Sequence, residues 1–238
     1  MVQKGELTLF FAIIVAAGRG ERVNSVVPKQ YLPLFGKPVL AHTLDVFERS
    51  PWIEEIIVVI NPLHEQMFKR EVWEKYGYRK VKKYVSGGET RQDSVYWGVR
   101  ELKDKGSDFV LIHDGVRPLV DEKILERCVE GVIKFEAICC AMPCVDTVKF
   151  SLDGEVIHET LNRQNIWRAQ TPQAFRVSLI WEALERAKEE GFKGTDDSSL
   201  VERMGKSVHL VLGSEDNLKI TTPQDLILAE ELLRWRKK

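Results

Sequence analysis

The chain has 238 residues, with 35 lysines and arginines against 36 aspartates and glutamates, so its formal net charge is −1. This length suits one α/β domain, and a charge near zero produces no overall field that would attract nucleic acid or a membrane surface. No apolar run approaches the roughly 18–20 residues that a membrane-spanning helix requires.

The cysteines and the N-terminal segment indicate the compartment. Cys128, Cys139, Cys140 and Cys144 lack the paired spacing of metal ligands, and buried free thiols are typical of a reducing cytoplasm. Residues 7–17 are apolar, but they have neither the charged start nor the cleavage site of a signal peptide. We therefore expect a cytoplasmic protein that binds neither nucleic acid nor a membrane.

The first predicted element is a buried strand over residues 10–15, which leads directly into a turn of small residues at 16–20. Free backbone N–H groups in such a turn can cradle a phosphate. The cations Arg22 and Lys29 follow, and Pro28 argues against one continuous helix between them. The segment therefore predicts a loop that folds back on a polyphosphate.

Two other interpretations of this turn fit less well. The dinucleotide-binding fingerprint requires a third glycine where this chain has Val23, and an acid after the second strand, where Asn61 stands. A glycine-rich turn without a ligand would leave the two cations beside Pro-Lys-Gln unexplained.

Strands and helices then alternate. Strands are predicted at 56–60, 81–85, 109–112, 137–142 and 208–212, and helices at 62–76, 92–103, 121–134, 177–190, from 195–197 to just before Gly205, and at 226–236. This order predicts an α/β fold with a largely parallel sheet and helices on both faces. Ligands are expected at the carboxyl ends of the strands.

Residues 146–160 interrupt this order. The segments 147–150 and 155–158 are predicted to form a β-hairpin with Asp153-Gly154 at its turn. Because an isolated two-stranded hairpin is only marginally stable in water, we expect this arm to pack on a second subunit. Packing on its own domain is the alternative.

Acidic and basic residues mark the ends of two strands. Asp114 follows strand 109–112, where it could hold a divalent cation against phosphates or simply cap a turn. Asp216 is a second such acid, after strand 208–212. Lys219, set among apolar residues, belongs either to a solvated edge or to a site on which other residues converge.

Three further polar segments suit substrates. The segment 87–94 follows a strand and opens a helix, and its glycines and small polar side chains suit a base or a ribose. Residues 162–164 and 170–173 flank the arm as polar turns, and their side chains could read a second, phosphorylated substrate.

These segments together resemble one family. In order, the chain contains Ala-Ala-Gly-Arg-Gly-Glu-Arg with Pro-Lys-Gln-Tyr, Gly-Gly-Glu-Thr-Arg-Gln-Asp-Ser-Val, His-Asp-Gly-Val-Arg-Pro, Asp-Thr-Val-Lys, Asn-Arg-Gln-Asn-Ile-Trp, Gln-Thr-Pro-Gln-Ala-Phe, Thr-Asp-Asp and Asp-Asn-Leu-Lys-Ile-Thr. From about residue 10 onward, the chain resembles the 2-C-methyl-D-erythritol 4-phosphate cytidylyltransferase family of the non-mevalonate isoprenoid pathway. The resemblance implies a Rossmann-like nucleotidyltransferase fold with a protruding β-hairpin arm. It also implies a single domain over residues 7–238 and a homodimer formed through residues 146–160.

The resemblance also implies roles for individual residues. Arg22, Lys29 and Lys219 would be catalytic, and Asp114 and Asp216 would hold Mg²⁺. The cytidine of CTP would bind at Ala16, Ala17, Gly18, Gly88, Glu89 and Ser94. The methylerythritol phosphate would bind at Arg117, Thr147, Arg163, Thr171, Thr195 and Lys219, with Thr147 and Arg163 supplied by the partner's arm. The chain departs from many members at Gly115-Val116, where they have two alanines, and at Glu89, where they have aspartate.

The implied chemistry fits these residue types. A phosphate monoester attacks the α-phosphorus of CTP and pyrophosphate leaves, so the nucleophile is already anionic and no general base is required. A ribitol-5-phosphate cytidylyltransferase is the alternative within this class. A non-catalytic nucleotide-binding module is a further alternative, but it would not need Arg22, Lys29 and two acids together.

Overall fold

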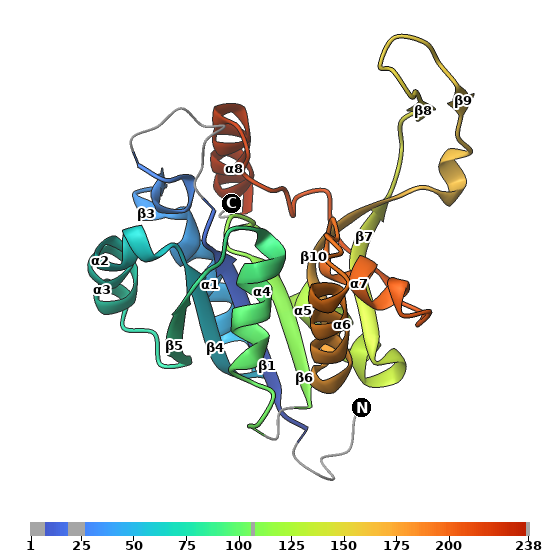
Figure 1. Ribbon diagram of the computed structural model, residues 1–238. Coiled ribbons are helices and arrows are strands. Elements are labelled where there is room, and N and C mark those ends of the chain that lie inside the picture. The colour runs from blue at the N-terminus through green and yellow to red at the C-terminus, as the bar shows by residue number, and fades with distance from the viewer. Residues whose placement is uncertain (1–7, 19–26, 106–107, 237–238) are drawn as a thin grey trace.

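The computed structural model describes residues 8–18, 27–105 and 108–236. Its centre is a seven-stranded sheet in the order β11-β7-β10-β6-β1-β4-β5 (Figure 1). The strands of this sheet are β1 (Phe10–Ala16), β4 (Ile53–Ile60), β5 (Val81–Ser86), β6 (Phe109–Asp114), β7 (Ala137–Pro143), β10 (Trp167–Arg176) and β11 (His209–Leu212).

The sheet is largely parallel, as predicted. β1 pairs in parallel with β4 on one side and with β6 on the other, and β4–β5 and β7–β11 are also parallel pairs. Only β10 runs antiparallel to its neighbours β6 and β7 within this sheet of the described chain. The chain passes from β1 outward to β5 and then returns to β6 on the opposite side of β1, which creates a crevice at the carboxyl ends of β1 and β6.

Helices cover both faces of the sheet because its strands alternate apolar side chains between two cores. Along β1, Ala12 and Ile14 pack on the side of α1 (Val39–Arg49) and α5 (Glu122–Phe135). Phe11 and Ile13 face the opposite side, where α4 (Arg91–Arg100), α6 (Val177–Glu189) and α7 (Asp197–Arg203) pack. The prediction of helices on both faces is therefore confirmed.

The remaining elements lie around this body. They are η2 (Lys29–Tyr31), β2 (Pro33–Leu34), β3 (Lys37–Pro38), η3 (Pro62–His64), α2 (Glu65–Phe68), η4 (Lys69–Trp73), α3 (Glu74–Tyr76), β8 (Lys149–Phe150), β9 (Glu159–Thr160), η5 (Arg163–Asn165) and α8 (Pro223–Arg236). A small third core joins α8 to the carboxyl end of the sheet through Leu34, Val116 and Ile220. No helix in the described ranges is both long and apolar enough to cross a membrane.

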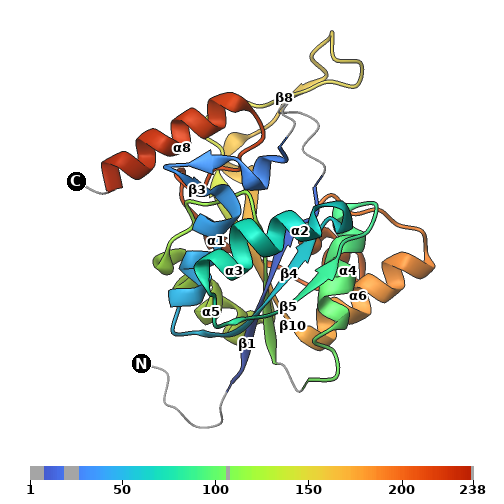
Figure 2. The same ribbon diagram turned by 90° about the vertical axis from the view of Figure 1, so that its left-hand side faces the viewer.

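The arm extends away from the body in both views (Figures 1 and 2). Its strands β8 and β9 pair antiparallel, with Lys149 opposite Thr160 and Phe150 opposite Glu159. The predicted second strand at 155–158 is therefore wrong. Asp153 forms a wider loop instead, because its carboxylate accepts hydrogen bonds from the backbone N–H groups of Glu155 and Val156.

The longest elements absent from the sequence-based prediction are helix α1 and strand β10. Helix α1 was not predicted, although Leu40, Leu44 and Phe47 recur at helical spacing after Pro38. Residues 170–173 were predicted as a polar turn, but they lie inside β10. This part of the strand lacks the apolar residues typical of a buried strand. Gln170 and Gln173 can be buried there because they donate hydrogen bonds to polar groups of the loops that cover them.

Candidate active site

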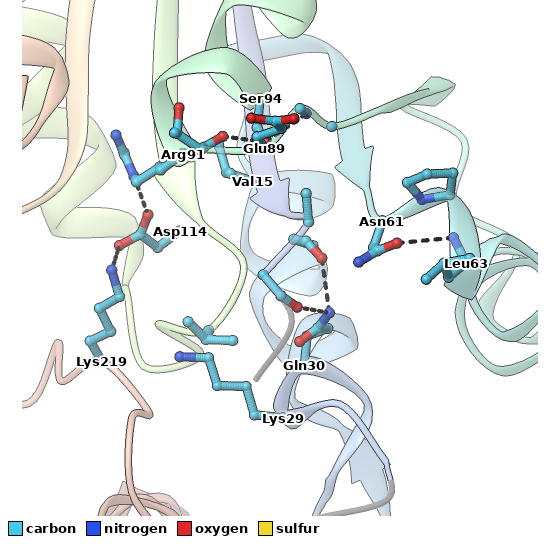
Figure 3. A pocket seen from close by; sticks show the side chains of 18 residues that line it. Val15, Lys29, Gln30, Asn61, Leu63, Glu89, Arg91, Ser94, Asp114 and Lys219 are labelled. Atoms are coloured by element: carbon cyan, nitrogen blue, oxygen red, sulfur yellow. Dashed lines mark hydrogen bonds and ion pairs between the residues drawn. The ribbon is translucent and has the colours of Figure 1, made fainter. Parts of the chain in front are cut away.

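A cavity of about 520 Å³ opens where the carboxyl ends of β1, β4, β5 and β6 meet (Figure 3). This is the crevice that the strand order creates beside β1. Its lining residues are Val15, Ala16, Ala17, Gly18, Lys29, Gln30, Asn61, Pro62, Leu63, Gly87, Gly88, Glu89, Thr90, Arg91, Ser94, Asp114, Val116 and Lys219.

The turn after β1 is held by Gln30, which is 1% exposed. The Gln30 amide Nε2 donates to the carbonyl of Ala16 at 2.9 Å and to that of Gly18 at 3.1 Å. A buried side chain that bridges two carbonyls of one turn fixes its backbone conformation. Lys29, the residue before Gln30, extends into the same cavity (Figure 3).

The opposite side of the cavity is the loop between β5 and α4. Thr90 and Asp93 form a reciprocal capping box at the start of α4, and Ser94 Oγ accepts the backbone N–H of Gly88 at 3.2 Å. A Cβ atom added at Gly87 would lie 2.3 Å from the Cβ of Ala17, so glycine is required for this close approach. The two small-residue segments therefore pack directly against each other and together line one wall of the cavity.

Cations surround Asp114 at the end of β6. Its Oδ1 atom accepts from Arg91 Nε at 2.9 Å, and its Oδ2 atom lies 2.7 Å from Lys219 Nζ (Figure 3). The Oδ2 atom also lies 3.7 Å from Arg117 Nε. Burial alone would raise the pKa of Asp114, but these three cations outweigh it and lower the pKa well below its ordinary value. Asp114 is therefore an anion at neutral pH.

Behind Asp114 lies a buried chain of hydrogen bonds centred on His113. The Nε2 atom of His113 donates to the carbonyl of Arg117 at 3.2 Å, so Nδ1 accepts from the Thr171 hydroxyl at 3.1 Å. The same hydroxyl accepts the backbone N–H of Asp114 at 3.1 Å. Burial lowers the pKa of His113 to about 3, so this histidine is neutral and serves as a fixed support.

The family model for 2-C-methyl-D-erythritol 4-phosphate cytidylyltransferase matches residues 10–235. The chain belongs to this family. Two members, from Geobacter metallireducens and Geotalea uraniireducens, are 48% and 46% identical over 227 and 224 residues. Each alignment covers 94% of this chain, with 97% and 96% of the relatives.

Solved structures of the cytidylyltransferase family share the fold. The 4-diphosphocytidyl-2C-methyl-D-erythritol synthase of Anaerococcus prevotii has a TM-score of 0.83 and 36% identity, over 95% of this chain and 96% of that chain. The family enzyme of Francisella tularensis has a TM-score of 0.80 and 32% identity, over 94% and 99% of the two chains. These matches confirm the predicted Rossmann-like nucleotidyltransferase fold, and the chain is a nucleotidyltransferase.

Most residues that the family resemblance assigns to CTP and catalysis come together in the cavity. They are Ala16, Ala17, Gly18, Lys29, Gly88, Glu89, Ser94, Asp114 and Lys219. Lys219 lines this cavity and lies 2.7 Å from Asp114 Oδ2. Arg22 lies outside the described residues.

Other predicted residues lie apart from the cavity lining. Asp216 is paired with Arg236 Nη2 of α8 at 3.0 Å. Thr147 is exposed on the arm, Arg163 is exposed in η5 shortly after it, and Thr195 is exposed before α7. Arg117 and Thr171 sit behind Asp114, and the Thr171 hydroxyl is engaged by His113.

Sequence reasoning missed Gln30 and Arg91, which line the cavity, and His113 and Asp197, which support it from behind. Arg91 gave one signal that could have been used. It is the first residue of α4, and a cation at a helix N-terminus is unfavourable unless acids compensate it. Gln30 and His113 gave no comparable signal, since their partners are backbone atoms and side chains of other segments.

Proposed function

We propose that the chain transfers a cytidylyl group from CTP to 2-C-methyl-D-erythritol 4-phosphate, giving 4-diphosphocytidyl-2-C-methyl-D-erythritol and pyrophosphate. The observation that carries this proposal is the cavity itself. Small residues of the turns after β1 and β5 line it together with the cations Lys29 and Lys219. We assign the part of the cavity lined by Lys29, Asp114 and Lys219 to the phosphates of CTP and call it the phosphate end. The membership of the chain in the cytidylyltransferase family supports the same reaction.

The small-residue wall of the cavity suits the nucleoside of CTP. The backbone at Ala16–Gly18 and at Gly88, with Ser94 and Glu89, would contact cytosine and ribose. The Gln30 bonds keep the first of these segments in place before any ligand arrives, which limits the entropy lost on binding.

The cations would perform the catalysis. Lys29 and Lys219, with Arg22, would offset the negative charge that accumulates around the α-phosphorus as the phosphate monoester attacks and pyrophosphate leaves. No proton has to be removed from the nucleophile. The buried, neutral His113 accordingly needs no role as a base.

Asp114, which lines the cavity, would be the Mg²⁺ ligand. Arg91 holds its Oδ1 atom and Lys219 its Oδ2 atom, so Asp114 would bind the ion through Oδ2 by releasing Lys219. In the described part of the chain, no three His, Cys, Asp or Glu side chains are grouped to hold a metal. This suits Mg²⁺, which commonly takes one or two carboxylates and completes its shell with phosphates and water. When bound, Mg²⁺ would supply further charge neutralisation on the triphosphate. Asp216 would become a second Mg²⁺ ligand only if its ion pair with Arg236 broke.

The arm would complete the second substrate site in a homodimer, with residues 7–238 forming one domain. Its tip exposes Leu152, Val156 and Ile157, which are 77%, 67% and 58% accessible. Apolar side chains on a two-stranded hairpin favour burial against another chain. Arg163, whose Nη1 donates to the carbonyl of Val145 at 2.8 Å, would then meet the methylerythritol phosphate of the partner's site. Arg117, Thr171, Thr195 and Lys219 would hold it from the chain's own body.

The test is pyrophosphate release with CTP, Mg²⁺ and one polyol phosphate at a time. We expect release with 2-C-methyl-D-erythritol 4-phosphate and a product of matching mass. Faster release with ribitol 5-phosphate would instead identify a ribitol-5-phosphate cytidylyltransferase. CTP binding without any release would identify a nucleotide-binding module.

A further inference from the structure

Arg91 occupies an unfavourable position that its surroundings explain. It is the first residue of α4, directly after the Thr90 cap, where the helix dipole repels a cation. Its side chain is 27% exposed. The contacts of the guanidinium group must therefore compensate for this unfavourable position.

Those contacts use one guanidinium group to join two acids. Arg91 Nε donates to Asp114 Oδ1 at 2.9 Å. Arg91 Nη1 and Nη2 donate to Asp197 Oδ1 and Oδ2 at 2.9 and 2.8 Å, in a bidentate pair. The Asp197 side chain is 1% exposed and lies at the start of α7, so it provides a rigid anchor.

This arrangement determines how the Asp114 carboxylate is turned. Because Arg91 takes Oδ1, the other oxygen, Oδ2, faces Lys219 at 2.7 Å. Asp197 does not line the cavity, so its influence on the site passes through Arg91. The guanidinium group therefore links the start of α4, the acid at the end of β6 and the first turn of α7.

We propose that Arg91, anchored by Asp197, is a positioning residue that aims the Asp114 carboxylate at the phosphate end of the cavity. This inference rests on the proposed cytidylyl transfer. Asp197, although it is buried and does not line the cavity, would then affect turnover through Arg91. Outer residues that orient a metal-binding or catalytic carboxylate typically contribute about 10- to 100-fold in affinity or activity.

Three variants test this role. Asp197→Asn keeps the shape of the anchor but removes its charge, and Arg91→Lys keeps the charge but cannot form the bidentate pair. The double variant Arg91→Gln with Asp197→Asn leaves neither member of that pair as an unpaired buried charge, so it is expected to fold even if a single variant does not. Asp45→Asn is the matched control, because Asp45 of α1 pairs with Lys37 of β3, and neither residue lines the cavity.

The measurements are kcat per folded molecule, well below each variant's melting temperature, and the CTP dissociation constant from calorimetry without the second substrate. We expect all three variants to lose about 10- to 100-fold in kcat while CTP affinity changes less than about threefold. Asp45→Asn should keep its kcat even where its melting temperature falls.

Two results would overturn the inference. If kcat per folded molecule stays within about threefold of the parent in Asp197→Asn or in the double variant, the Arg91–Asp197 pair serves only stability. If CTP affinity falls in parallel with kcat, Arg91 contacts the nucleotide directly and does not act through Asp114. Failure of the proposed function is a separate outcome, since the unmodified chain would then release no pyrophosphate.

Discussion

Lys219 Nζ and Asp114 Oδ2 lie 2.7 Å apart, so the lysine and the acid at the phosphate end of the cavity are paired with each other. Arg91 and Arg117 also contact Asp114, at 2.9 and 3.7 Å. The carboxylate can therefore release Lys219 to a phosphate without becoming a lone buried charge. This pairing keeps Lys219 close to the place where charge would accumulate.

Removing either lysine should abolish most turnover without unfolding the chain. We expect Lys29→Ala and Lys219→Ala each to lower kcat by about 10²–10³, the usual cost of removing one preorganised charge partner of a transition state. Circular dichroism should remain native. Lys105→Ala, which removes a surface pair with Glu55, is the control and should keep full activity. More than about a third of the parental kcat in either test variant would refute the assigned role.

Gln30→Ala should weaken CTP binding more than it lowers kcat. The variant loses the bonds to Ala16 and Gly18, each contributing about 0.5–1.5 kcal/mol, so we expect the CTP dissociation constant to rise about tenfold. Calorimetry with CTP measures this directly. Unchanged CTP affinity in a folded variant would show that the turn keeps its shape without Gln30.

His113 predicts a specific loss of stability in acid. Because burial lowers its folded-state pKa from 6.5 to about 3, the unfolded chain binds more protons between these values. The free energy of unfolding should therefore fall as pH decreases from 6.5, by up to about 1.4 kcal/mol per pH unit from this group. His113→Gln keeps a donor and an acceptor but does not titrate. Urea titrations at pH 7, 6 and 5 should show a shallower decline for this variant, and parallel declines would contradict the prediction.

Mixing two inactive variants tests the arm. If Arg163 acts across a dimer, a mixed dimer of Lys29→Ala and Arg163→Ala has one site with both residues intact and one with neither. Activity should then recover toward about half of the parental value per mixed dimer under conditions that exchange subunits. No recovery, with exchange verified by mass spectrometry of tagged chains, would place Arg163 in the site of its own subunit.

The sequence predicted those parts of the fold that a local pattern encodes. The apolar runs of β1, β4 and β6 and the cap at Asp121 before α5 are features of neighbouring residues. β10 was missed because its Gln170 and Gln173 are buried by pairing with Ser214 and Asp196, which come from distant loops. A buried polar strand resembles a turn until its partners are known.

The residues of the candidate site likewise fall into those that a local motif indicates and those that depend on distant segments. Lys29, Gly88 and Asp114 could be assigned because they fall in motifs that follow strands, and they line the cavity. The pairing of Asp216 with Arg236 could not, since it depends on where α8 docks. From the sequence alone, Asp197 is an ordinary acid in the first turn of α7. Its connection to the site becomes visible only through its ion pair with Arg91.

β10 begins at the base of the arm and passes beside β6 as far as Arg176, with Thr171 behind Asp114 on the way. The pairing of β10 with β7 shifts register between Ala169 and Gln173. The residues that fix the alignment of β10 against β7 on its far side therefore lie beside Thr171 and not in the arm. The arm therefore cannot be exchanged for that of a relative without its attached strand β10. A chimera that borrows this arm from a relative would need its second junction beyond Arg176, because a junction earlier in β10 would separate the arm from the strand register that places Thr171.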